Sequence, residues 1–111
     1  MFRRAWPAAV LAVAATLAAA EPPAVLLVGD STMAPDTGYG DALCARLEPA
    51  LACLNLARGG RSTLSYRAEG LWDRVLARLR ARAPGTPAHV LIQFGHNDQP
   101  GKSVPSRRRP A

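Results

Sequence analysis

The chain has 111 residues, of which 49% are hydrophobic and 20% charged, and a formal net charge of +6. This length allows one small domain at most, and the composition excludes a disordered chain. The excess positive charge lies at the two ends, in Arg3 and Arg4 and then in Lys102 and residues 107–109. Residues 21–98 hold eight basic and eight acidic side chains. Because this central part is neutral, most of the case for a nucleic-acid or membrane partner is removed.

Residues 1–20 have the pattern of a secretory signal peptide. Arg3 and Arg4 give a positive start, an uncharged stretch rich in Ala, Val and Leu follows, and residues 18–20 are three alanines suited to cleavage. A transmembrane anchor is the alternative, but the run is short and contains Pro7. We therefore expect a secreted or periplasmic protein that begins at Glu21 and has no membrane partner after cleavage.

The first three predicted elements of the mature chain are a strand, a helix and a strand. Residues 24–28 are a continuous apolar run, typical of a strand that is buried on both faces. Residues 41–48 have helical spacing and stop at Pro49. A second apolar run, residues 52–57, predicts another strand before a pair of glycines.

The longest predicted helix covers residues 64–82, which carry apolar side chains on one face. The other face is basic and is interpreted as solvated, with Arg67, Arg74, Arg78 and Arg82. After a turn at residues 84–87, residues 89–94 predict a third strand. The resulting order β-α-β-α-β predicts a parallel sheet with right-handed crossovers.

Cys44 and Cys53 are the two cysteines of the chain. In an oxidising compartment they can form one disulfide. The sequence is equally consistent with two small buried hydrophobic side chains that are not bonded to each other. There is no C-x-x-C pair and there are only two histidines, so no metal-ligand spacing is present. We expect neither a metal nor another cofactor.

Each predicted strand ends in a polar turn that contains glycine, at residues 29–32, 59–62 and 95–98. If the strand order is 2-1-3, the three turns share the carboxyl edge of the sheet, where ligands bind in such folds. They would gather a hydroxyl, backbone amides and a side-chain amide, the groups that acyl transfer needs. The sequence has no phosphate loop, dinucleotide fingerprint or G-x-S-x-G elbow.

Three motifs in this order resemble the first three conserved blocks of the SGNH (GDSL-type) hydrolases. They are GDSTM at 29–33, NLARGGRS at 55–62 and FGHNDQ at 94–99. Their wording is closest to the rhamnogalacturonan acetylesterase-like branch, over residues 24–102. The resemblance implies an α/β fold, the flavodoxin-like three-layer α/β/α arrangement with a parallel sheet, here truncated after the third strand. It also implies a carboxylic ester hydrolase whose substrate is an acetylated polysaccharide such as pectin, or a small ester.

The resemblance further implies roles for individual residues. Ser31 would be the nucleophile that forms an acetyl-enzyme. The backbone N–H of Gly60 would belong to the oxyanion hole, with Gly59 as the near alternative, and the side-chain amide of Asn97 would be a second donor. Asp30 would fix the turn. Each of these residues alone is explained by turn formation, and only the three motifs together favour the catalytic interpretation.

The sequence departs from the family pattern at the catalytic base. SGNH hydrolases carry it in a late D-x-x-H block, and these 111 residues contain no such block. His89 begins a predicted strand and is interpreted as structural, and His96 occupies a turn position of the third motif. We therefore expect the chain to be inactive alone, and a non-catalytic carbohydrate-binding remnant is the alternative.

The end of the sequence suggests a reason for this departure. After Lys102 the family pattern gives way to a proline- and arginine-rich stretch, and we hypothesise a frameshift or premature stop there. The predicted organisation is a signal peptide at 1–20, the N-terminal part of a hydrolase domain at 21–102 and a non-native basic tail at 103–111. A nucleic-acid-binding role for the tail is disfavoured because no aromatic residue accompanies its arginines. The oligomeric state is left open.

Overall fold

The computed structural model describes residues 3–5 and 21–100. The predicted basic tail, and the predicted signal peptide apart from residues 3–5, lie outside the described residues. The elements follow the expected alternation, with a short 3-10 helix η1 last: β1 (Ala24–Gly29), α1 (Gly40–Leu47), β2 (Ala52–Asn55), α2 (Thr63–Ala68), α3 (Leu71–Arg80), β3 (Ala88–Gln93) and η1 (His96–Asp98).

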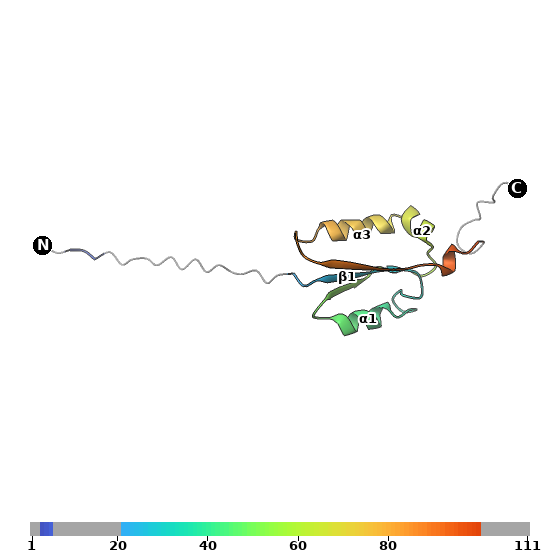
Figure 1. Cartoon of the computed structure of the whole chain (residues 1–111), viewed down its shortest axis with the longest axis horizontal. Helices are drawn as coiled ribbons and strands as arrows, with labels where there is room; N and C mark the ends of the chain where they lie inside the picture. Colours follow the sequence, from blue (N-terminus) through green and yellow to red (C-terminus); the bar gives the residue numbers. More distant parts are fainter. Residues whose placement is uncertain (1–2, 6–20, 101–111) are drawn as a thin grey trace.

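The strands form one parallel sheet in the order β2-β1-β3. Helix α1 covers one face, and α2 and α3 cover the other (Figure 1). The predicted α/β class, the parallel pairing and the strand order 2-1-3 are therefore confirmed. Among the described helices, none combines the length and the apolar character that crossing a membrane requires.

The central strand β1 organises the core, because all six of its residues are buried. Alternate side chains of β1 serve the two faces of the sheet. One face packs on α2 and α3 through Ala24, Leu26, Val28, Tyr66, Leu71 and Val75. The other faces α1 and the loop after β1, through Val25, Leu27, Met33, Ala34 and Ala57. This arrangement holds the carboxyl end of β1 from both sides.

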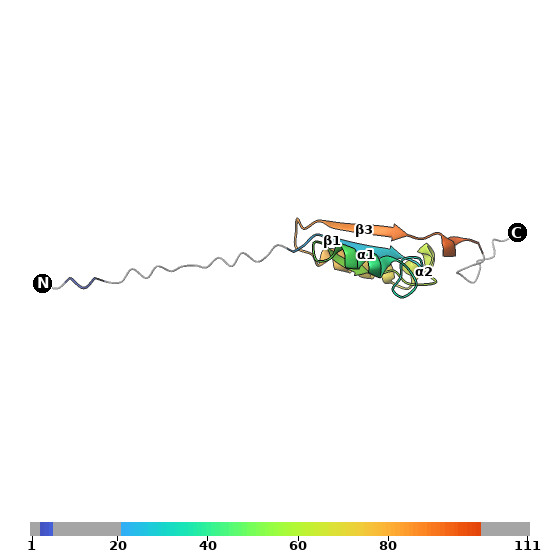
Figure 2. The same cartoon turned by 90° about the horizontal axis from the view of Figure 1, so that it is seen from below.

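Strand β3 lies at an edge of the sheet, as Figure 2 shows. Within the described ranges, no strand pairs with its outer side. Leu91 is 40% exposed and Ile92 is 59% exposed. The outer side of β3 therefore presents backbone groups that no neighbouring strand of the described ranges pairs with.

The prediction of one helix over residues 64–82 is wrong. Helix α2 ends at Ala68 and α3 begins at Leu71. Gly70 separates them with φ of +76°, in the left-handed region that favours glycine. The side chain of Glu69, at the same break, is held by Arg61. The chain can therefore turn between the two helices without a steric penalty.

Cys44 and Cys53 are joined in a disulfide, with their Cα atoms 5.1 Å apart. The sequence left open whether the two cysteines are bonded, and in the structure they are. The disulfide links α1 to β2 and so ties this helix covalently to the sheet.

Candidate active site

Ser31 lies in the turn that directly follows β1, at the carboxyl edge of the sheet. Its neighbour Asp30 is buried, and one carboxylate oxygen accepts a hydrogen bond from the Thr32 N–H at 3.0 Å. This Asx-type contact tightens the turn, as expected for Asp30. The Ser31 carbonyl accepts a second bond, from the Thr37 hydroxyl at 2.9 Å. The half-buried Ser31 is therefore held on a short, internally bonded turn.

Both neighbouring strands are tied to this turn by backbone hydrogen bonds. The Asp30 N–H donates to the Gln93 carbonyl at the end of β3 at 3.2 Å. The Arg58 N–H, after β2, donates to the Gly29 carbonyl at 3.0 Å. The three glycine-containing turns accordingly share one edge of the sheet, as the strand order predicted.

Gly59 lies directly beside Ser31. A Cβ atom built on Gly59 would stand 3.7 Å from the Ser31 Cβ atom, so the two residues are in van der Waals range. Gly60 follows with φ of +76°, and a Cβ atom there would meet nothing within 4 Å. Of the two candidate oxyanion-hole glycines, Gly59 is thus the one that lies beside the candidate nucleophile.

Arg61 fixes this glycine loop. Its Nη1 atom donates to the Gly59 carbonyl at 2.9 Å, while Nε and Nη2 bind the two carboxylate oxygens of Glu69 at 2.9 and 3.1 Å. This two-point contact is the geometry in which arginine binds carboxylates best. The hydrogen bond from Arg61 lowers the pKa of Glu69, and the same bond raises the pKa of Arg61. Sequence reasoning did not identify this pair, although Arg61 lies in the second motif, NLARGGRS.

Replacement of Glu69 by Gln should lower the free energy of unfolding at neutral pH but not at low pH. Because the pKa of Glu69 is lowered by folding from its ordinary 4.5, the ion pair stabilises the chain above that pH. The stabilisation is lost as the pH falls through the lowered value. At pH 7 we expect Glu69→Gln to unfold at a slightly lower urea concentration than the wild type. At about pH 2 the two proteins should unfold at the same urea concentration. A gap that persists unchanged at acid pH would contradict this assignment.

The third motif is tied to the second by two contacts. The side-chain amide of Asn97 donates to the Arg61 carbonyl at 3.1 Å. Asp98 accepts hydrogen bonds from both the backbone N–H and the hydroxyl of Thr63, at the start of α2. Asn97 therefore lies against the glycine loop, at the same carboxyl edge of the sheet as Ser31.

Two further residues that sequence reasoning missed connect the turns. The Asn55 amide donates to the Met33 carbonyl at 2.9 Å and to Asp41 at 3.0 Å, and its oxygen accepts from the Ala57 N–H at 3.1 Å. The hydroxyl of buried Tyr66 donates to the Leu56 carbonyl at 2.8 Å, and burial raises the pKa of Tyr66. The polar Asn55 inside the apolar run at residues 52–57 was the available signal. Its contacts also explain why β2 ends at Asn55 and not at Ala57.

The two histidines occupy different ends of β3. His89 pairs with Val25, near the amino end of the sheet and away from Ser31. His96 begins η1, after the carboxyl end of β3. No group of three or more His, Cys, Asp or Glu side chains suited to a metal ion occurs in the described segments.

Comparison with known proteins finds two curated rhamnogalacturonan acetylesterases. The enzyme of Emericella nidulans is 40% identical over 75 residues, which cover 67% of this chain and 28% of that protein. Rhamnogalacturonan acetylesterase RhgT of Bacillus subtilis is 38% identical over 88 residues, covering 71% of this chain and 35% of that protein. The chain thus spans about a third of the length of these relatives. No protein-family profile matches the chain, and no solved structure matches it. These matches, at 38–40% identity over about 70% of this chain, support an SGNH-type, acetylesterase-like region, in agreement with the three motifs assembled at one edge of the sheet.

Proposed function

We propose that this chain carries the nucleophile and the oxyanion-binding groups of a serine esterase that removes acetyl groups from a rhamnogalacturonan-type polysaccharide. The observation that supports this most is the assembly at one sheet edge. Ser31 lies beside Gly59, and Asn97 is bonded to Arg61 of the same glycine loop. An attacking hydroxyl next to amide donors is the arrangement that acyl transfer requires.

In the proposed reaction, the Ser31 Oγ attacks the acetyl carbonyl and loses its proton to a base. The negative charge that develops on the carbonyl oxygen is stabilised by the Gly60 N–H, the Asn97 amide and the Ser31 N–H. The ester C–O bond then breaks, and the sugar hydroxyl leaves with a proton. Water attacks the acetyl-serine and releases acetate. Each oxyanion donor of this kind typically contributes about 3–4 kcal/mol.

In the family pattern the base belongs to an Asp-x-x-His block, and these 111 residues contain no such block. A base must lie within hydrogen-bond reach of the serine hydroxyl. We therefore propose that the chain assayed alone releases no measurable acetate. We also propose that residues 1–20 direct export, which would bring the chain to extracellular polysaccharide.

Adding an external base tests this proposal. Acetylated rhamnogalacturonan is incubated with the full chain at pH 7.5, with and without imidazole, and released acetate is measured. With imidazole present, we expect the folded chain to release acetate at least about 10-fold faster than the urea-unfolded chain does. Equal release with folded and unfolded chain would contradict the esterase proposal. If equilibrium binding to the polysaccharide then persists, the non-catalytic carbohydrate-binding remnant is the better description.

A further inference from the structure

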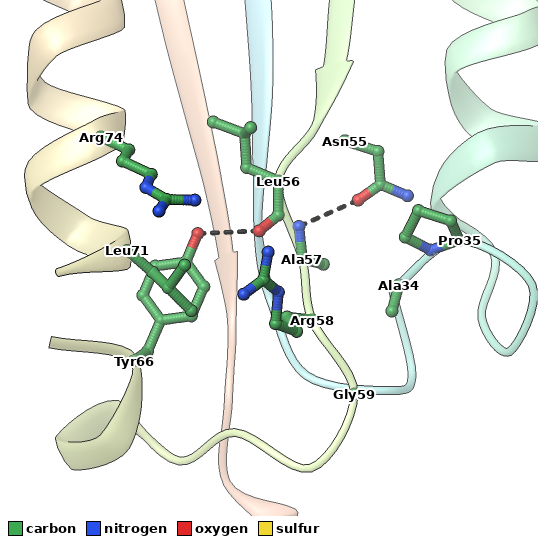
Figure 3. A pocket seen from close by; sticks show the side chains of 10 residues that line it. All are labelled: Ala34, Pro35, Asn55, Leu56, Ala57, Arg58, Gly59, Tyr66, Leu71 and Arg74. Carbon is green, nitrogen blue, oxygen red and sulfur yellow. Dashed lines mark hydrogen bonds between the residues drawn. The ribbon is translucent and has the colours of Figure 1, made fainter. Parts of the chain in front are cut away.

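A pocket of about 370 Å³ opens at the carboxyl end of β2, next to the turn that carries Ser31 (Figure 3). Its walls come from three parts of the chain: Ala34 and Pro35 after β1, residues 55–59 at the end of β2, and three residues of α2 and α3. Gly59 lines the pocket and also lies beside Ser31. The pocket is therefore contiguous with the candidate nucleophile, although Ser31 itself does not line it.

Two arginines face each other across this pocket. Figure 3 shows the guanidinium groups of Arg58 and Arg74 entering from opposite walls, on either side of the bond between Tyr66 and the Leu56 carbonyl. The charge of Arg58 also opposes the rise in the pKa of Tyr66, which agrees with its place near that hydroxyl. No Asp or Glu lines the pocket.

Both charges lack a protein counter-ion within residues 3–5 and 21–100. Neither Arg58 nor Arg74 makes a side-chain hydrogen bond or ion pair there. Glu69, on which the charge of Arg58 also acts, is already held at both oxygens by Arg61. Two exposed cations that converge without an acid repel each other, and a bound anion would relieve this repulsion.

The remaining lining suits a sugar ring. Pro35, Ala34 and Leu71 supply apolar surface, while Asn55 supplies a polar edge. Pockets for small molecules combine mostly apolar walls with a few convergent polar groups. Arginine is the side chain whose planar fork matches a carboxylate at two points.

We propose that this pocket is a carboxylate subsite, in which Arg58 and Arg74 bind the carboxylate of an acidic sugar unit of the same polysaccharide whose acetyl ester meets Ser31. The position of the ester rests on the proposed function, whereas the binding of the acidic sugar does not require turnover. Because Gly59 is shared, an occupied pocket would place the neighbouring sugar unit beside the Ser31 turn.

Equilibrium binding of unacetylated probes tests the proposal. The full chain is titrated with trigalacturonic acid and with its carboxyl-reduced counterpart, by calorimetry and by the shifts of backbone amide signals. We expect the acid to bind at least about 10-fold more tightly and to move the signals of residues 55–59. Arg58→Gln and Arg74→Gln should each weaken binding about 5- to 10-fold and leave the circular dichroism unchanged.

Arg80→Gln is the matched control, because Arg80 is exposed on the same helix as Arg74 and does not line the pocket. It should alter binding less than twofold. Equal weakening by Arg80→Gln would overturn the proposal in favour of unspecific charge attraction. Equal binding of the reduced trisaccharide would overturn it as well. Inorganic phosphate that competes as strongly as trigalacturonic acid would show a general anion site and would refute recognition of an acidic sugar.

Failure of this proposal and failure of the esterase proposal are distinguishable. The trisaccharide carries no acetyl group, so its binding needs no nucleophile and should survive Ser31→Ala. Arginine-dependent binding without acetate release would remove only the esterase proposal. Imidazole-dependent acetate release without arginine-dependent binding would remove only the carboxylate subsite.

Discussion

Ser31→Ala should reduce imidazole-dependent acetate release by at least about 10-fold, to the rate seen with unfolded chain. The reason is that the external base can activate only a nucleophile that is present, and Ser31 is the hydroxyl held beside Gly59. Initial rates of acetate release at several imidazole concentrations measure the effect. The wild-type rate should rise with imidazole, whereas the variant should follow the blank throughout.

Thr32→Ala is the matched control for this experiment. Thr32 is the next residue in the same turn and its side chain is exposed, while its backbone N–H makes the bond to Asp30. Loss of the Thr32 hydroxyl should therefore leave the turn and the rate nearly unchanged. If Thr32→Ala and Ser31→Ala lowered the rate equally, the nucleophile would have been assigned to the wrong residue.

Gly38→Ala should destabilise the chain by about 3 kcal/mol or more. A Cβ atom on Gly38 would lie 2.2 Å from the Thr32 carbonyl oxygen and 2.5 Å from the Met33 nitrogen, and both are backbone atoms that no side-chain rotation can move. The loop that carries Ser31 would have to shift. Since small domains are stable by only about 5–15 kcal/mol, the midpoint of urea unfolding should fall steeply.

Gly59→Ala provides the comparison for Gly38→Ala. Its new Cβ atom would meet only the Ser31 Cβ atom, at the ordinary contact distance of 3.7 Å. We expect Gly59→Ala to change the unfolding midpoint much less than Gly38→Ala. Similar losses for both variants would show that the close approach at Gly38 is not the cause.

The sheet was predictable from the sequence because its signals are local and consistent. The buried run at residues 24–28 and the turn residues after each strand give the parallel order once the helices between them are recognised. The break at Gly70 was hidden because apolar side chains continue at helical spacing on both sides of it. The left-handed conformation of Gly70 and the contact of Glu69 with Arg61, eight residues earlier, are visible only in the structure.

The candidate site was predictable as a set of residues but not as a set of contacts. Ser31, Gly60 and Asn97 come from motifs, whereas the bonds of Asn55 to Met33 and Asp41 join residues far apart in the sequence. The basic helix face that the sequence predicts shows the same difficulty. Periodicity groups Arg74 with Arg82, yet Arg82 donates to the Pro22 carbonyl at 2.7 Å while Arg74 lines the pocket.

The alternation of β1 limits how this protein can change in evolution. Successive residues of β1 belong to different cores, as Leu26 and Leu27 do. A single inserted or deleted residue within β1 would exchange the two sets of side chains and would also turn Ser31 away from Gly59. We therefore expect length variation among descendants of this sequence to avoid β1 and to collect in loops such as residues 83–87, where the chain can lengthen without changing either core.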